Sequence, residues 1–150
     1  MTSEKKSILL VTAMLLALAS LAFAKTDLVN HDRGGIAIQG YDPVAYFTDS
    51  KPLKGDSQFS YRWRDSLWLF TSAQHRDLFA KNPEQYAPQY GGYCAYGVSE
   101  GHTVDIDPAA WKIIQGKLYL NYDNSVQRRF LKEPEGRIRR ADQNWPGLHK

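Results

Sequence analysis

The sequence predicts a single compact α+β domain, with a small antiparallel sheet built from hairpins and short helices packed on it. Two pairs of apolar segments predict the hairpins, one within residues 58–70 and the other within 111–122, because a short polar turn interrupts each pair. Capping residues and helix-ending prolines follow each pair and predict the helices. Residues 25–150 are numerous enough to bury one hydrophobic core, so we expect one domain there.

The first 24 residues have the pattern of a signal peptide. Lys5 and Lys6 precede an apolar run over 8–21, which is followed by the small-residue motif AFA at 22–24. We therefore expect cleavage after Ala24, and a periplasmic or secreted mature protein that contacts the membrane only through this segment before cleavage. An uncleaved membrane anchor is the competing interpretation, but the apolar run is shorter than the roughly 20 residues that a spanning helix needs.

The composition of the mature chain limits its partners. Residues 25–150 carry 17 basic and 15 acidic side chains, once the two lysines and one glutamate of the first 24 residues are set aside, so nucleic acid is not expected as a partner. Cys94 is the only cysteine, so no internal disulfide can form. Both methionines fall in the signal segment, and the mature chain therefore lacks the thioether ligand that favours Cu(I).

The N-terminal part of the domain predicts a strand, a bend and a hairpin. Apolar residues around Gly40 predict a first strand over 36–41, and Pro43 predicts an extended segment that bends at the proline. Residues 58–63 alternate between polar and aromatic side chains, which is the period of a half-buried strand. The apolar run at 67–70 follows a turn and pairs with it as an antiparallel hairpin.

Two helices are predicted directly after this hairpin. Thr71 and Gln74 form a capping-box pattern at the start of the first helix, which Pro83 ends. Asn82 and Pro83 are a favourable N-cap and first residue for a second, short helix that runs through Tyr86.

Residues 111–122 give the clearest local prediction, a hairpin with its two-residue turn at Gln115 and Gly116. This register places four apolar side chains on one face of the hairpin. The predicted cross-strand pairs are Trp111 with Leu120, Ile113 with Leu118, Lys112 with Tyr119, and Ile114 with Lys117.

Further helices are predicted on both sides of the second hairpin. Before it, residues 93–98 predict one or two helical turns. After it, Asp123 or Asn124 is a favourable N-cap for one helix. Pro134 opens a final helix, which Pro146 ends.

Three side chains carry the chemistry that the sequence suggests. Cys94 is a candidate nucleophile or metal ligand, but free cysteine is also among the most buried residue types, so a core position is the alternative. His75 lies on the apolar face of its predicted helix, and His102 lies in a loop eight residues beyond Cys94. Each histidine is a candidate metal ligand, but a position in or at the rim of the core would also explain His75, and a polar, solvent-exposed position would also explain His102. So few ligands allow only an open or labile site for Cu or Zn, because a closed zinc site needs four.

Several motifs along the mature chain together resemble the YHS domain family. They are YDPVAYF at 41–47, FTS at 70–72, NPE at 82–84, YGGYCA at 90–95, GKLYLNY at 116–122 and NWP at 144–146. The last three are similar to an exported subgroup described as YHS domain-containing (seleno)proteins, in some of which selenocysteine stands at the position of Cys94. The resemblance covers nearly all of the mature chain.

The resemblance implies metal binding, because YHS domains are thought to bind metal through cysteines and occur attached to copper- and heavy-metal-transporting ATPases. Three of the cysteine positions differ in this chain, where Ala45, Thr71 and His75 stand instead. One imidazole therefore remains of the three side chains that the family pattern would supply.

These observations leave three hypotheses for the function. The first is an exported module that binds a soft or borderline metal ion such as Cu or Zn, with Cys94 as the central ligand and His75 or His102 assisting. The second is a redox protein in which an oxidant converts Cys94 to a sulfenate that a small external thiol resolves. The third is a non-catalytic structural or interaction domain.

Overall fold

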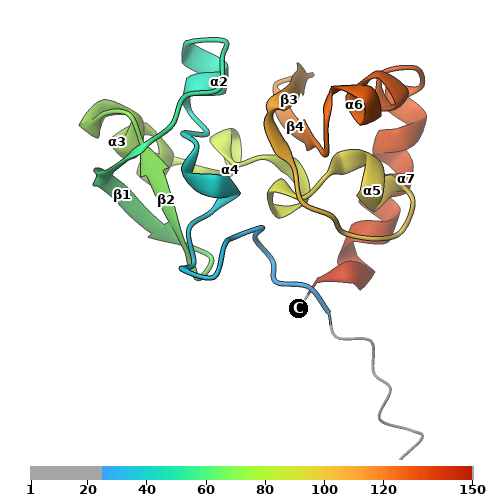
Figure 1. Cartoon of the computed structure of the whole chain (residues 1–150), viewed down its shortest axis with the longest axis horizontal. Helices are drawn as coiled ribbons and strands as arrows, with labels where there is room; N and C mark the ends of the chain where they lie inside the picture. Colours follow the sequence, from blue (N-terminus) through green and yellow to red (C-terminus); the bar gives the residue numbers. More distant parts are fainter. Residues whose placement is uncertain (1–24, 150) are drawn as a thin grey trace, which may run out of the picture.

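The computed structural model describes residues 25–149, and the predicted signal peptide lies outside this range. Two antiparallel hairpins form the strands: β1 (Asp56–Trp63) pairs with β2 (Ser66–Phe70), and β3 (Asp107–Ile114) pairs with β4 (Lys117–Asn121). The hairpins lie on opposite sides of the view in Figure 1, each with its own helices. The α+β class is therefore confirmed, and within residues 25–149 its strands form two small two-stranded sheets.

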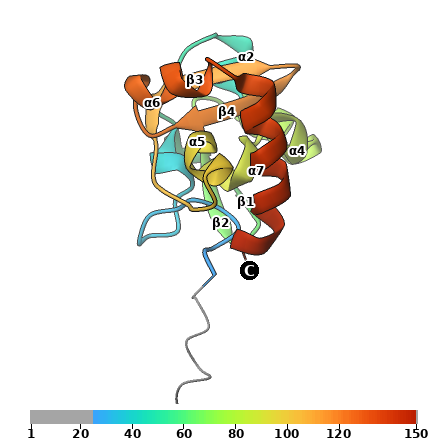
Figure 2. The same cartoon turned by 90° about the vertical axis from the view of Figure 1, so that its right-hand side faces the viewer.

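Short helices connect and cover the hairpins. The α-helices are α2 (Ala45–Thr48), α3 (Ala73–Lys81), α4 (Pro83–Tyr86), α5 (Ala95–Ser99), α6 (Asn124–Phe130) and α7 (Pro134–Leu148), and the 3-10 helices are η1 (Ile38–Gly40) and η2 (Gln89–Gly92). Helix α7 is the longest of these and runs beside α5 (Figure 2). None of the helices within residues 25–149 combines the length and apolar character that crossing a membrane requires.

The second hairpin has the register that the sequence predicts. Trp111 faces Leu120, Ile113 faces Leu118, and the two remaining predicted pairs are also present. Both turn residues, Gln115 and Gly116, have positive φ, of 51° and 75°. Two consecutive positive φ values give a turn whose twist matches that of the flanking strands, so the turn fixes the register.

Four local predictions need correction. The segment 36–41 is not a strand but contains η1, because Ile36 and Tyr41 form only isolated bridges. The extended segment predicted around Pro43 instead leads into α2 at Ala45. Helix α3 is capped by Ser72 and not by Thr71, because the Ser72 side chain accepts the backbone N–H of His75. Finally, α7 continues through Pro146, which lies in its last turn, and ends two residues later at Leu148.

Strand β4 lies at the junction of two hydrophobic clusters because both of its faces are buried. Leu118 and Leu120 belong to the larger cluster, whereas Tyr119 belongs to the smaller one. The larger cluster joins both hairpins, through Tyr46, Trp68, Phe70, Phe79, Cys94, Leu118 and Leu120 among others. The smaller cluster lies between β4 and the last helices, and contains Tyr90, Ala95, Val98, Tyr119, Phe130 and Ala141.

Candidate functional site around Asp42 and His75

The sulfur of Cys94 is buried at the start of α5, with only 1% of the residue exposed. Sγ accepts the backbone N–H groups of Gly97 at 3.4 Å and Tyr122 at 3.3 Å. The thiol donates to Oδ1 of Asn121 at 3.7 Å. Burial raises the pKa of the Cys94 thiol, and the backbone N–H groups oppose this rise only in part. The protonated, enclosed thiol therefore has the surroundings of a core side chain.

The two candidate histidines lie on different parts of the fold from one another. His75 is in the first turn of α3, beside the first hairpin, whereas His102 follows α5 and is exposed. The contacts of the Cys94 sulfur come from backbone N–H groups and an amide, not from either imidazole. Within residues 25–149, no group of three or more His, Cys, Asp or Glu side chains is arranged to hold a metal ion.

We expect Cys94 to resist alkylation in the native protein. Iodoacetamide should react at least about a hundredfold more slowly with folded than with guanidinium-unfolded protein, because the reagent must wait for an opening of the structure. The native rate should stay low between pH 7 and 9, where the unfolded thiol, with its pKa near 8.5, ionises. A native rate within tenfold of the unfolded rate would show that the sulfur is reachable. The measurement is mass spectrometry of timed samples.

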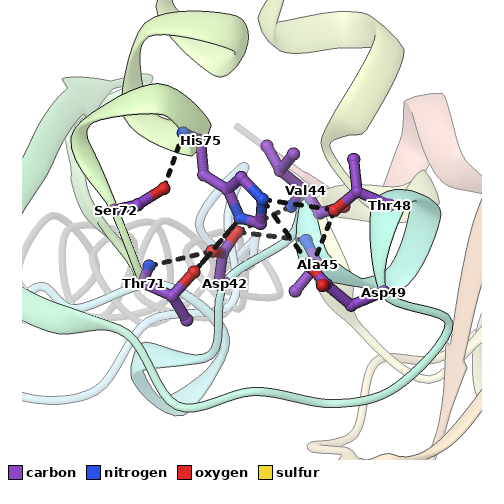
Figure 3. A network of polar contacts seen from close by, with 8 residues as sticks. All are labelled: Asp42, Val44, Ala45, Thr48, Asp49, Thr71, Ser72 and His75. Atoms are coloured by element: carbon purple, nitrogen blue, oxygen red, sulfur yellow. Dashed lines mark hydrogen bonds and ion pairs between the residues drawn. The ribbon is translucent and has the colours of Figure 1, made fainter.

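A different group of polar side chains converges on the carboxylate of Asp42, which is fully buried. Oδ1 accepts the backbone N–H groups of Val44 at 2.9 Å and Ala45 at 3.2 Å. Oδ2 accepts both the backbone N–H and the hydroxyl of Thr71, each at 2.9 Å (Figure 3). These donors come from two segments nearly 30 residues apart, so the carboxylate ties α2 to the start of α3. Five donors in all, with the His75 ring, surround a buried anion that would otherwise be unstable.

The imidazole of His75 is held by the same carboxylate. Its Nδ1 lies 2.6 Å from Oδ2 of Asp42, so we assign the ring proton to Nδ1, as donor to the carboxylate. This tautomer leaves a lone pair on Nε2, which lies 3.2 Å from Oγ1 of Thr48 and 3.7 Å from Oδ2 of Asp49. Figure 3 shows the ring between Asp42 on one side and the end of α2 on the other. The side chains of His75 and Asp49 are 14% and 39% exposed, so solvent can reach this edge.

Local structure explains how these side chains meet. The Asp-Pro sequence makes a turn in which Asp42 receives the first N–H groups of α2, and this places Thr48 and Asp49 one helical turn later. Ser72 caps α3 by accepting the N–H of His75 at 3.1 Å, which fixes the direction of the ring. Nearby residues specify the turn at Asp42 and the cap at Ser72. The contact between these two segments depends on the tertiary packing.

The sequence identified His75 but missed the roles of Asp42, Thr48, Thr71 and Asp49. Thr71 was expected to be a helix cap. A signal for the site did exist, since positions 45, 71 and 75 are the three at which the YHS resemblance implies ligands. In the structure all three positions contact Asp42.

An imidazole fixed at one nitrogen and free at the other can serve as a metal ligand or as a base. Metal-binding histidines commonly donate their second ring N–H to a carboxylate, as His75 does to Asp42. A tetrahedral ion with bonds of about 2.0–2.2 Å holds its ligand atoms about 3.3–3.5 Å apart. The 3.7 Å between Nε2 and Oδ2 of Asp49 is close to that separation, so these two donors fit one ion after a small side-chain shift. They do not fit a thiolate site, because Ala45 and Thr71 supply no sulfur.

Comparisons with models of known families, with curated proteins and with solved structures found no match for this chain.

Proposed function

We propose that residues 25–150 form an exported YHS-like module that binds a borderline divalent ion, Zn²⁺ or Cu²⁺, through Nε2 of His75 and the carboxylate of Asp49. Asp42 would orient the imidazole, whereas Cys94 would pack in the hydrophobic core and would not coordinate the ion. The observation that carries this proposal is the 2.6 Å contact between Nδ1 of His75 and the buried carboxylate, which directs the other nitrogen toward a second carboxylate at the surface.

The donor set favours particular ions. Imidazole suits Zn²⁺ and Cu²⁺, whereas Cu(I) is selected by thiolates and thioethers, which this site lacks. Two protein donors leave the remaining coordination positions to water or to another molecule. Such a site exchanges its ion readily, which suits transient binding or transfer to a partner better than a permanent structural role.

The thiol hypotheses receive less support from the structure. A sulfenate at Cys94 would have to form at a protonated sulfur that is 1% exposed, and a resolving thiol would have to reach it. The interaction-domain hypothesis makes no use of the His75 site at all. Metal titration separates the metal site from both of these alternatives.

We expect the exported protein to bind about one equivalent of Zn²⁺ or Cu²⁺ in calorimetric titration. His75→Ala should abolish the binding, and Asp49→Asn should weaken it about tenfold or more, because the anionic ligand becomes a neutral amide. His102→Ala and Cys94→Ser are the matched controls, one imidazole and one sulfur outside the site, and both should bind as the wild type does. Circular dichroism of each variant shows whether the fold is retained.

Two results would contradict the proposal in different ways. Loss of binding in Cys94→Ser, with binding retained in His75→Ala, would place the ion at the thiol. No saturable binding of either ion by the folded wild-type protein would leave the redox and interaction-domain hypotheses, which the alkylation of Cys94 separates.

A further inference from the structure

A cleft of about 390 Å³ lies away from the His75 site, where the two hairpins meet the last helix. Its walls come from the turn of the first hairpin, the segment from α4 to η2, the turn of the second hairpin, and α7. Ligand sites of small molecules commonly have volumes of about 300–1,000 Å³ and lie between structural units. The charged and indole side chains that line this cleft are Trp63, Arg64, Glu84, Lys117, Asp142 and Trp145.

Contacts within the cleft fix the positions of its walls. The Arg64 guanidinium donates to Glu84 at 3.0 Å and lies 4.2 Å from the centre of the Trp63 ring, so the first hairpin turn is held against α4. On the opposite wall, the hydroxyl of Tyr90 donates to Oδ1 of Asp142 at 2.9 Å. Tyr90 also meets the Trp145 ring edge-on, with 6.1 Å between ring centroids.

The backbone of this wall is held in an unusual conformation. Tyr90 has a φ of 57°, in the left-handed region that side chains other than glycine seldom adopt. Strain of this kind costs about 1–3 kcal/mol and concentrates at ligand sites. Burial, followed by the bond to Asp142, raises the pKa of the Tyr90 hydroxyl, so it remains a proton donor to Asp142 at any ordinary pH.

The charges of the cleft cancel, and this restricts the ligand. Arg64 and Lys117 oppose Glu84 and Asp142, so neither an anion nor a cation gains a net attraction. Each carboxylate already accepts one donor, from Arg64 or from Tyr90, and has an oxygen left for a second. The Lys117 ammonium forms no ion pair with a residue in the described part of the chain.

We propose that this cleft binds a small neutral saccharide. Sugar hydroxyls both donate and accept hydrogen bonds, so they match a lining of carboxylates, an ammonium and a guanidinium whose charges balance. The C–H faces of a sugar ring are apolar and pack against an aromatic ring, which Trp145 supplies, since the Arg64 guanidinium already covers the Trp63 ring. A zwitterionic amino acid is the competing small ligand, and titration with glycine and alanine distinguishes it from a saccharide.

Tryptophan fluorescence of the exported protein tests this proposal, because two of the four tryptophans line the cleft. We expect a saturable change in emission with glucose, cellobiose, N-acetylglucosamine or its β-1,4 dimer. Asp142→Asn should weaken binding about tenfold, since a charged acceptor is lost while the amide oxygen can still accept from Tyr90. Asp77→Asn, an exposed carboxylate on α3 outside the cleft, is the matched control and should bind as the wild type does.

Lys117→Ala provides a second test at the exposed first residue of β4, where the substitution leaves the core intact. It should weaken saccharide binding, whereas Lys112→Ala on the same hairpin should not. The proposal is overturned if none of the four saccharides gives a saturable signal, if glycine or alanine binds and the saccharides do not, or if Asp142→Asn and Lys117→Ala both bind with unchanged affinity. None of these outcomes depends on the metal site, because His75→Ala should retain saccharide binding.

Discussion

Replacing Asp42 with alanine is expected to lower the free energy of unfolding by about 3–5 kcal/mol, because each buried donor left without an acceptor costs about 1–3 kcal/mol. The substitution leaves four protein donors, on Val44, Ala45 and Thr71, without an acceptor, and it also frees the His75 ring. Because small domains are stable by only about 5–15 kcal/mol, this loss is a large part of the total. Urea unfolding followed by circular dichroism, in metal-free buffer, measures it.

Asp49→Asn is the matched control for this prediction. Asp49 lies in the same cluster, but its side chain is 39% exposed and its carboxylate is 3.7 Å from the His75 ring. A surface contact of this kind contributes about 0–1 kcal/mol. Equal losses in the two variants would show that Asp42 does not have the central role assigned to it. If Asp42→Ala does not accumulate, Asp42→Asn provides the measurement, since its amide retains one acceptor oxygen and a smaller loss is expected.

Replacing Gly91 with alanine is expected to destabilise the protein by more than about 3 kcal/mol. Gly91 has a φ of 63°, which costs an L-residue about 1–2 kcal/mol. Its added Cβ would also overlap the carbonyl oxygen of Leu28 and lie 3.1 Å from Cα of Val29. Overpacking of this kind typically adds about 1–3 kcal/mol, and here the neighbour is backbone that cannot rotate away. The N-terminal segment is fixed at this point, since Gly91 O accepts the N–H of Asn30 at 2.9 Å.

Gly101→Ala separates the two causes of that effect. Gly101 also has a positive φ, of 90°, but a Cβ there would meet no atom within 4 Å. The control should therefore show only the backbone strain, about 1–2 kcal/mol. The difference between the two variants in urea unfolding gives the cost of the contact with Leu28. Losses of the same size would contradict the close approach of the two segments.

Predictions from the sequence succeeded where the decisive interactions are local. The register of the second hairpin depends on a two-residue turn and on apolar alternation, and both can be read within 12 residues. The cap of α6 was predicted at Asp123 or Asn124 for the same reason, and Asp123 accepts the N–H of Val126 three residues later. The prediction for Thr71 failed because its hydroxyl is used by a distant residue, Asp42, and not by its own helix.

The sequence by itself determined the α+β class, the two hairpins and the helix starts at Pro83, Asn124 and Pro134, because turn residues, capping residues and side-chain periodicity act over a few positions. Only the tertiary structure decided that the Cys94 sulfur is enclosed and that His75 faces Asp42. Those outcomes depend on segments 27 to 33 residues apart packing around a shared core. No short sequence pattern specifies which polar groups are buried next to each other. These groups form their hydrogen bonds only when packing of the hydrophobic clusters brings the segments into contact.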